Sequence, residues 1–240
     1  LAEKSDRLGG TMIVAGYPIA KQHFAQATKY LVKRTYDCNI NIELNTCVDE
    51  AYMSQLHFDH ILVCCGAKPI ELDICKNHPH SGVAQDILLG KMWAGKNVVI
   101  IGGGSVGCEV ADFIAPLVND RHPNNKKITV IEMKSNIITD DTSPSRSVLV
   151  QRMAKKGVNI ITDAKVIDVN ETSVTYLKDG KEVTLNDVDT VLQAVGYQSD
   201  KAIIDVLDKM NLSYNVLGDG NHPGKIKNAI SDAYQICKDL

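Results

Sequence analysis

A glycine-rich turn between two apolar segments is the part of this chain best suited to chemistry. The run 97–101 is apolar after its first residue and leads into Gly102-Gly-Gly-Ser-Val-Gly107-Cys-Glu109. A second apolar run ends at Glu132, which stands 25 positions after the last glycine (132 − 107). A buried strand, a glycine turn, a helix and a later acid are the arrangement that a dinucleotide needs.

Three glycines of this turn have distinct expected roles. Gly102 permits the tight turn, Gly104 lets the backbone approach a pyrophosphate, and Gly107 allows close packing of helix and strand. The N-terminus of the helix offers unpaired N–H groups and a partial positive charge to the phosphates. The residues expected to bind the dinucleotide at this turn are Gly102, Gly103, Gly104, Ser105, Val106 and Gly107.

Glu132 indicates which nicotinamide nucleotide the turn prefers. Its carboxylate would accept hydrogen bonds from the adenosine ribose hydroxyls and would repel a 2′-phosphate. The sequence therefore favours NADH over NADPH, although Lys134, two residues later, weakens that preference slightly.

Composition argues against nucleic-acid-binding, membrane-spanning and disulfide-rich proteins. The 240 residues fit one or two domains, and 44% hydrophobic residues with a net charge of −3 are ordinary for a globular protein. Neither a basic stripe nor interleaved aromatics suggest nucleic-acid binding. The longest apolar runs are far too short for a membrane span, and we expect no signal peptide. Seven cysteines without a C-x-x-C argue against a disulfide framework or zinc site, which predicts a cytoplasmic protein.

Apolar periodicity predicts alternating strands and helices, and hence an α/β fold. The predicted strands are 41–44, 60–65, 97–101, 128–132, 158–162, 166–169, 174–177, 190–195 and 214–217. The predicted helices are 21–33, 84–91, 105–117, 144–156, 200–210 and 225–238. Residues 7–11 and 66–69 are predicted as loops, 70–82 as an irregular crossing between domains, and 120–127 as a polar insertion. The run 60–65 is uniformly apolar, as in an interior parallel strand, and Asp179-Gly180 predicts a hairpin.

Five blocks resemble, in order and spacing, the carboxy-terminal part of flavoproteins with two dinucleotide-binding domains. Within this group the chain is most similar to flavin-dependent enoate and dienoyl-CoA reductases and to trimethylamine dehydrogenase. The blocks are 3–10, 59–67, 98–109 with Glu132, 189–196 and 216–219. The resemblance implies two Rossmann-like domains of the glutathione-reductase type. An incomplete FAD-binding domain at 1–80 and 210–240 would be interrupted by an NAD-binding domain at 81–209.

The resemblance also implies residues for the FAD site. Glu3 would hold the adenosine ribose, although a solvated surface acid is the alternative. Gly9 and Gly10 would follow the flavin nucleotide through their backbone. Cys47 and Val48 would lie near the adenine, with core packing an equally good interpretation of these two residues.

The segment Cys64-Cys65-Gly66 departs from the Ala-Thr-Gly that is usual in the family. Loss of the threonine hydroxyl puts a side-chain contact in doubt, but Gly66 still permits close backbone approach. A redox thiol pair is a less favoured alternative, because adjacent strand residues point to opposite faces. Asp219, next to Gly218, would bond the ribityl chain of FAD, unless it only forms a turn between two glycines.

Three further positions are implied near the reacting rings. The helix start at 225–229 would place its dipole near the flavin. Glu109 would point toward the nicotinamide ribose or amide, with an exposed helical acid as the alternative, and Gly196 would line the nicotinamide pocket. We expect no catalytic acid or base and no metal ligand in this chain.

The implied reaction passes hydride from NADH to FAD and then single electrons to an iron–sulfur cluster and FMN, where an activated alkene is reduced. Because the chain opens at Leu1 and in mid-sheet, we expect a fragment that is inactive alone. The FMN, the 4Fe-4S cluster and any homo-oligomer contacts would belong to an upstream part. The lack of C-x-x-C and of a long extension after Asp219 argues against disulfide reductases. The alternatives are a non-catalytic ADP- or NAD-binding module and a reductase subunit feeding a ferredoxin-type acceptor.

Overall fold

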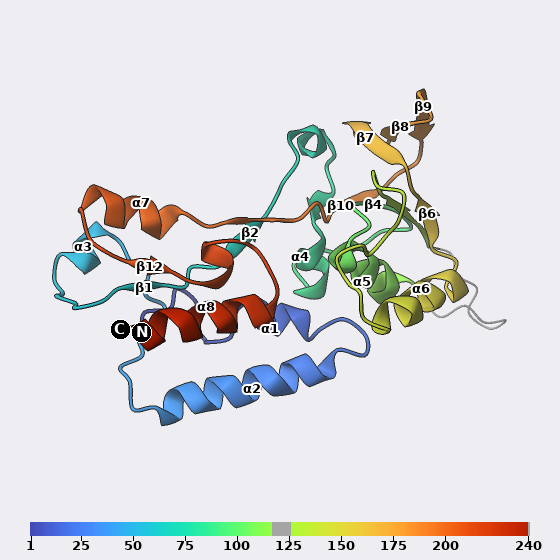
Figure 1. Cartoon of the computed structure of the whole chain (residues 1–240). Coiled ribbons are helices and arrows are strands. Elements are labelled where there is room, and N and C mark those ends of the chain that lie inside the picture. The colour runs from blue at the N-terminus through green and yellow to red at the C-terminus, as the bar shows by residue number, and fades with distance from the viewer. Residues whose placement is uncertain (117–125, 240) are drawn as a thin grey trace. The chain divides into compact units, whose positions relative to one another are not determined.

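The computed structural model describes residues 1–116 and 126–239 (Figure 1). Most of the predicted polar insertion at 120–127 lies outside these residues. The chain divides into two compact units, which are described separately. Unit 1 comprises Leu1–Ile13, Phe24–Lys68 and Tyr197–Leu240, and unit 2 comprises Val14–His23 and Pro69–Gly196.

Unit 2 contains a five-stranded parallel sheet in the order β3-β10-β4-β5-β6. Its strands are β3 (Ser81–Val83), β4 (Asn97–Ile101), β5 (Lys127–Ile131), β6 (Asn159–Ile161) and β10 (Thr190–Gln193). The chain leaves β4 toward β5 and β6 on one side, while β10 lies on its other side. The carboxyl end of β4 is therefore a topological switch point, where open α/β sheets bind ligands.

The strand β4 explains why this sheet forms. Its residues Val98–Ile101 are β-branched and at most 6% exposed. Alternate side chains enter different cores: Val98 and Ile100 belong to one apolar cluster, Val99 and Ile101 to the other. A strand buried on both faces has this uniform apolar composition, as the sequence predicts.

Helices cover one face of the parallel sheet. A small antiparallel sheet packs in the apolar core on the opposite face. The helices are α4 (Ala84–Leu88), α5 (Ser105–Ile114) and α6 (Ser145–Lys155), and α5 and α6 lie side by side in Figure 1. The antiparallel strands are β7 (Ala164–Val169), β8 (Val174–Lys178) and β9 (Lys181–Leu185), with the 3-10 turn η1 (Asp73–Asn77) nearby. Asp179 and Gly180 both have positive φ in the β8–β9 turn, which confirms the predicted hairpin.

A buried ion cluster joins α5 to α6. The Asp112 side chain is 1% exposed, and its Oδ2 accepts from Arg152 Nε at 3.0 Å and lies 2.8 Å from Nη2. Lys156 Nζ, on a residue that is 6% exposed, lies 2.9 Å from Asp112 Oδ1. Two cations therefore compensate one carboxylate that is removed from water, as a buried charge requires.

Unit 1 is built from short strand pairs and helices. Its elements are α1 (Gly10–Ala15), α2 (Gln22–Asp37), α3 (Glu50–Met53), β1 (Leu62–Val63), β2 (Ala67–Pro69), β11 (Tyr197–Ser199), α7 (Ala202–Lys209), β12 (Asn215–Val216), η2 (Gly218–Gly220) and α8 (Ile226–Asp239). The unit boundary falls within α1, within α2 and at the end of β2. The strands pair as β1 with β12 and β2 with β11, and Met53, Val63 and Leu207 form the buried core.

Several sequence predictions for this unit were wrong. Residues 41–44 form only a single parallel bridge, between Ala2 and Glu43. The run 60–65 contributes the two-residue strand β1, and Leu62 is 40% exposed. An apolar strand is buried only when other elements cover both its faces, and among the described residues β1 pairs with β12 alone. Gly10 begins a helix rather than lying in a loop, and 67–69 form a strand.

The segment 70–82 and the end of α5 also differ from prediction. The expected irregular crossing contains η1 and β3, and α5 ends at Ile114 rather than near residue 117. The capping residue Ala115 is extended, with ψ 116°, and precedes Pro116, which disfavours helical backbone at the position before it.

Candidate functional site

The glycine turn follows β4 and is held tightly by its neighbours. Gly102 has φ +106°, and an ideal Cβ there would lie 2.4 Å from the carbonyl oxygen of Ala194. A Cβ on Gly107 would lie 2.0 Å from the carbonyl oxygen of Gly102. Both positions thus need glycine because backbone atoms lie where a side chain would begin. The tight turn and the close helix–strand packing expected from the sequence are present.

Glu132 follows β5 and binds the backbone of the same turn. Its Oε2 accepts from the Gly103 N–H at 2.7 Å and its Oε1 from the Lys134 N–H at 2.8 Å. The residue is 8% exposed. These bonds fix the carboxylate beside the turn, and because each oxygen has a further lone pair, it can still accept from a ribose hydroxyl.

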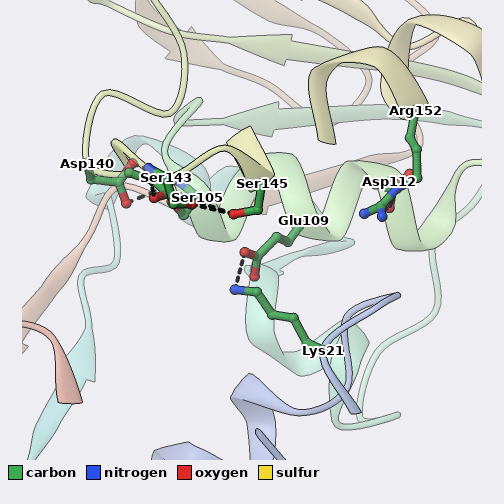
Figure 2. A network of polar contacts seen from close by, with 9 residues as sticks. Lys21, Ser105, Glu109, Asp112, Asp140, Ser143, Ser145 and Arg152 are labelled. Atoms are coloured by element: carbon green, nitrogen blue, oxygen red, sulfur yellow. Dashed lines mark hydrogen bonds and ion pairs between the residues drawn. The ribbon is translucent and has the colours of Figure 1, made fainter. Parts of the chain in front are cut away.

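Gly104 is the open position of the turn. An ideal Cβ there would meet a single atom within 4 Å, the Oδ1 of Asp140 at 3.9 Å. The Ser105 N–H, at the start of α5, donates to the same Oδ1 at 3.2 Å. Figure 2 shows this aspartate beside Ser105, Ser143 and Ser145. Asp140 could not be identified from the sequence, since it lies 35 positions from Ser105 in a loop without a motif.

Glu109 lies on α5 and forms an ion pair and hydrogen bond with Lys21, toward which it points in Figure 2. Both residues belong to unit 2. The Glu109 side chain is 14% exposed, so its interpretation as an exposed helical acid is wrong. Burial raises the pKa of this carboxyl, and Lys21 opposes that rise by stabilising the charged form.

Replacing Lys21 with glutamine tests this pair. Without the Lys21 cation to stabilise the carboxylate, burial should raise the pKa of Glu109 further. A carboxyl with a raised folded-state pKa favours the folded state at low pH, and this contribution is lost as the pH rises through that pKa. The K21Q variant should therefore be about 1–2 kcal/mol less stable at pH 7 and closer to wild type in acid. Urea unfolding at several pH values measures this, and a deficit that grows toward low pH would contradict it.

The carboxyl ends of three neighbouring strands bring the unit 2 residues together. Gly102 follows β4, Glu132 follows β5, and Gly196 lies just after β10. Gly196 has φ +110°, and its carbonyl accepts from the Ile70 N–H at 3.0 Å. These positions share one edge of the sheet, as expected of a ligand site at a switch point.

The residues expected around FAD near the chain start fall in unit 1. The Glu3 carboxylate accepts from the backbone N–H of Ser5 at 2.8 Å and from its hydroxyl. Gly9 has φ +123° and a Cβ there would lie 3.0 Å from Ile13 and Thr28 side-chain atoms, whereas Gly10 has open space around it. Gly9 is thus confined by packing, whereas a ligand could approach the backbone at Gly10.

Among the later unit 1 residues, Gly66 follows β1, and Gly218 and Asp219 lie in η2 before α8. Gly66 has φ +74° with nothing near its Cβ position, and its carbonyl accepts from the Asp200 N–H. Asp219 Oδ1 accepts from the Gly224 N–H at 2.9 Å, as a turn-forming aspartate does. Gly218 has φ +57°, and a Cβ there would lie 2.9 Å from the Cβ of Ala229. The conformation of this segment therefore depends on glycine.

The surroundings of Val48 and of the pair Cys64 and Cys65 bear on their predicted roles. Val48 packs against the core formed by Met53 and Val63. Burial raises the pKa of the Cys64 and Cys65 thiols, whereas a nucleophilic or redox thiol needs a lowered pKa. Within the described residues no cluster of three or more histidine, cysteine or acidic side chains could hold a metal ion. No helix in that part of the chain has the length and apolar character to cross a membrane.

The chain matches a known protein family over most of its length. The family model described as pyridine nucleotide-disulphide oxidoreductase matches residues 16–219. The chain belongs to this family. Membership confirms the predicted fold class of Rossmann-like nucleotide-binding domains.

The chain is also similar to individual enzymes and to a solved structure. The chain is 28% identical to a metal reductase of Desulforamulus reducens over 259 aligned positions, which cover 97% of the chain and 39% of the relative. It is 24% identical to a cinnamate reductase of Clostridium sporogenes over 243 positions, or 100% of the chain and 35% of the relative. The solved complex of 2-naphthoyl-CoA reductase with 2-naphthoyl-CoA matches with a TM-score of 0.86 and 25% identity, over 98% of the chain and 35% of that protein.

The chain thus spans little more than a third of the length of these relatives. The predicted resemblance to enoate-reductase-like flavoproteins is confirmed. The contacts of each site residue with a nucleotide stay predictions.

Proposed function

We propose that this chain binds NADH and FAD and passes electrons from NADH to the flavin within a larger flavoprotein. The observation that carries the proposal is the glycine turn at the carboxyl end of β4, with Glu132 bonded to its backbone. Family membership supports the pyridine nucleotide as ligand.

The unit 2 residues fit a dinucleotide. The open position at Gly104 leaves space for a pyrophosphate that a Cβ would fill. The first N–H groups of α5, from Ser105 onward, lack intrahelical partners by the nature of a helix N-terminus and would bind the phosphates, with Gly103 and Val106 as neighbours. Glu132 would orient the adenosine ribose, and Gly196 would leave room for the nicotinamide.

The unit 1 residues fit the flavin nucleotide. Gly10 and Gly66 have open space at their Cβ positions, which supports close approach of a ligand to the backbone. Glu3 would bind the ribose and Asp219 the ribityl chain, with Gly9, Val48 and Gly218 shaping the backbone around them. When bound, the flavin supplies an acceptor for hydride that can release electrons singly. The chain's own task is then to bind and orient, and Glu109 with Lys21 would hold a balanced charge on the nicotinamide side.

The domain assignment follows from these sites. We assign residues 1–80 and 210–240 to an FAD-binding domain and 81–209 to an NAD-binding domain. The compact units support a discontinuous arrangement of this kind, with boundaries nearer residues 69 and 196. The cytoplasm is the proposed location, and homo-oligomerisation would involve the remainder of the protein.

The terminal acceptor belongs to the whole protein. Cinnamate and 2-naphthoyl-CoA, named for two relatives, are conjugated unsaturated acids or thioesters, which supports reduction of an activated C=C bond through FMN and an iron–sulfur cluster outside this chain. Because the chain is also similar to a metal reductase, the second candidate function is electron transfer to a different terminal acceptor.

Anaerobic mixing of the full-length protein with NADH tests electron transfer. We expect a flavin absorbance band in the visible blue that NADH bleaches. A colourless protein that binds ADP but transfers no electrons would instead identify a non-catalytic nucleotide-binding module.

Replacing Glu132 with alanine tests the choice of nucleotide. The loss of a carboxylate that accepts from the turn and from the ribose should weaken NADH binding about tenfold or more, because hydrogen bonds to charged groups contribute roughly 1.5–3 kcal/mol each. NADPH binding should change less, so discrimination falls. Fluorescence titration with both nucleotides measures this, with circular dichroism as the folding control. Unchanged affinities for both would rule out this role.

A further inference from the structure

The loop that follows β5 places a carboxylate at the N-terminus of α5. The Ser105 N–H donates to Asp140 Oδ1 at 3.2 Å, with Oδ2 at 3.4 Å. Ser105 is the first residue of a ten-residue helix. Asp140 therefore accepts from a group that the proposed function assigns to a phosphate oxygen.

The same carboxylate faces the open position of the turn. The Oδ1 of Asp140 is the one atom within 4 Å of an ideal Cβ on Gly104. Absence of a side chain at this position is what would let a pyrophosphate approach the backbone. A helix N–H and the space over a glycine thus place Asp140 where the pyrophosphate would lie.

The loop is anchored in this position. The Ile138 N–H donates to the carbonyl of Gly103 at 2.7 Å, and the Ile138 side chain is buried, at 1% exposure. Ile138 has φ +52°, a left-handed conformation that a β-branched residue adopts only when its surroundings impose it. Arg146 Nη2 also donates to the carbonyl of Ile137 at 2.9 Å. The position of Asp140 is therefore set by packing two residues away.

Asp140, Asp141 and Glu132 add negative charge beside the start of α5, whereas Glu109 is paired with Lys21. Asp140 and Asp141 both contribute to the raised pKa of Glu109, after burial. The pKa of Cys108, next to Glu109, is raised to about 12, first by burial and then by Asp140, Glu132 and Glu109. A dianionic pyrophosphate entering this region would meet unfavourable charge.

We propose that Asp140 occupies the pyrophosphate position and competes with any nucleoside diphosphate for the N-terminus of α5. This inference rests on the proposed function of the turn. Binding then requires the carboxylate to leave the Ser105 N–H, which lowers affinity.

Replacing Asp140 with asparagine tests the competition. The amide oxygen can still accept from the Ser105 N–H, but the charge is gone. We expect NADH and ADP to bind about three- to tenfold more tightly, since a unit charge about 4 Å away contributes on the order of 1 kcal/mol in water. Adenosine, which has no pyrophosphate, should bind as to wild type. The gain should be larger at low ionic strength, where exposed charges are less screened.

Asp141 supplies the matched control. Its carboxylate accepts from the Ser143 N–H at 2.8 Å and from the hydroxyls of Ser143 and Ser145. The variant D141N changes the net charge equally without touching the Ser105 N–H, so its gain for NADH should be clearly smaller. Asp140→Ser, which removes the charge and keeps an oxygen that can accept a hydrogen bond, should reproduce the gain if D140N folds poorly.

The outcomes separate the two proposals. In one outcome, wild type binds NADH saturably while a folded D140N or Asp140→Ser variant binds it with the same or a lower affinity. That result would overturn the role of Asp140. An equal gain in D141N would also overturn it, because general charge would then account for the effect. No saturable binding of NADH or ADP to wild type would overturn the proposed function itself, and the competition with it.

Discussion

Replacing Gly107 with alanine is expected to destabilise unit 2 by about 3–5 kcal/mol, because overpacking a rigid site is costly. The new Cβ would lie 2.0 Å from the carbonyl oxygen of Gly102 and 3.1 Å from the Cβ of Ala194. The oxygen is a backbone atom of a turn that is itself confined, so no side-chain rotation relieves the overlap. Urea unfolding followed by circular dichroism measures the loss, and NADH binding should disappear with it.

Gly104 provides the matched control for Gly107. Its φ of −69° suits alanine, and the nearest atom to a Cβ there is 3.9 Å away. The variant G104A should therefore keep its stability within about 1 kcal/mol, as expected where no clash forms. Its NADH binding should still weaken, because the methyl group would occupy space assigned to the pyrophosphate. A G107A variant as stable as G104A would contradict the packing described for the turn.

Replacing Asp112 with alanine is expected to cost about 3–5 kcal/mol, the usual effect of removing one partner from a buried ion pair. The change would leave the ammonium of Lys156 buried without this counter-charge, while Arg152 is 29% exposed and can reach water. Asp112→Asn should lose much of the same stability, because it keeps the shape but removes the charge. Urea unfolding at neutral pH measures both variants.

The pair Lys33–Asp37 on α2 is the control for charge removal. Its side chains are 75% and 48% exposed, so Asp37→Ala should have little effect. A loss in D112A no larger than that in D37A would mean that the buried cluster contributes nothing to stability.

Elements with local signals could be predicted from the sequence. The strand β4 is a continuous run of β-branched residues, and the turn after it contains the glycines that its backbone geometry requires. The β8–β9 hairpin follows from Asp179-Gly180. In each case a short segment carries both the composition and the conformational requirement, so no distant contact had to be known.

Features that depend on distant contacts could not be predicted in this way. Lys21 and Glu109 are 88 positions apart, and their pairing depends on the tertiary fold. The run 60–65 is apolar, yet its burial depends on which elements cover it. Asp112 is an exception with a usable signal: it interrupts an apolar helical segment, and two cations stand four positions apart later in the chain, Arg152 in α6 and Lys156 just after it.

A crystal structure of the protein with NADH bound would show whether the glycine turn and the start of α5 hold the pyrophosphate. We expect pyrophosphate oxygens within about 3 Å of the amide nitrogens of Ser105 and Val106, the normal hydrogen-bond distance. We also expect the ribose hydroxyls to donate to Glu132 and the carboxylate of Asp140 to be displaced from Ser105. NADH bound elsewhere, with Asp140 still bonded to the start of α5, would contradict both expectations.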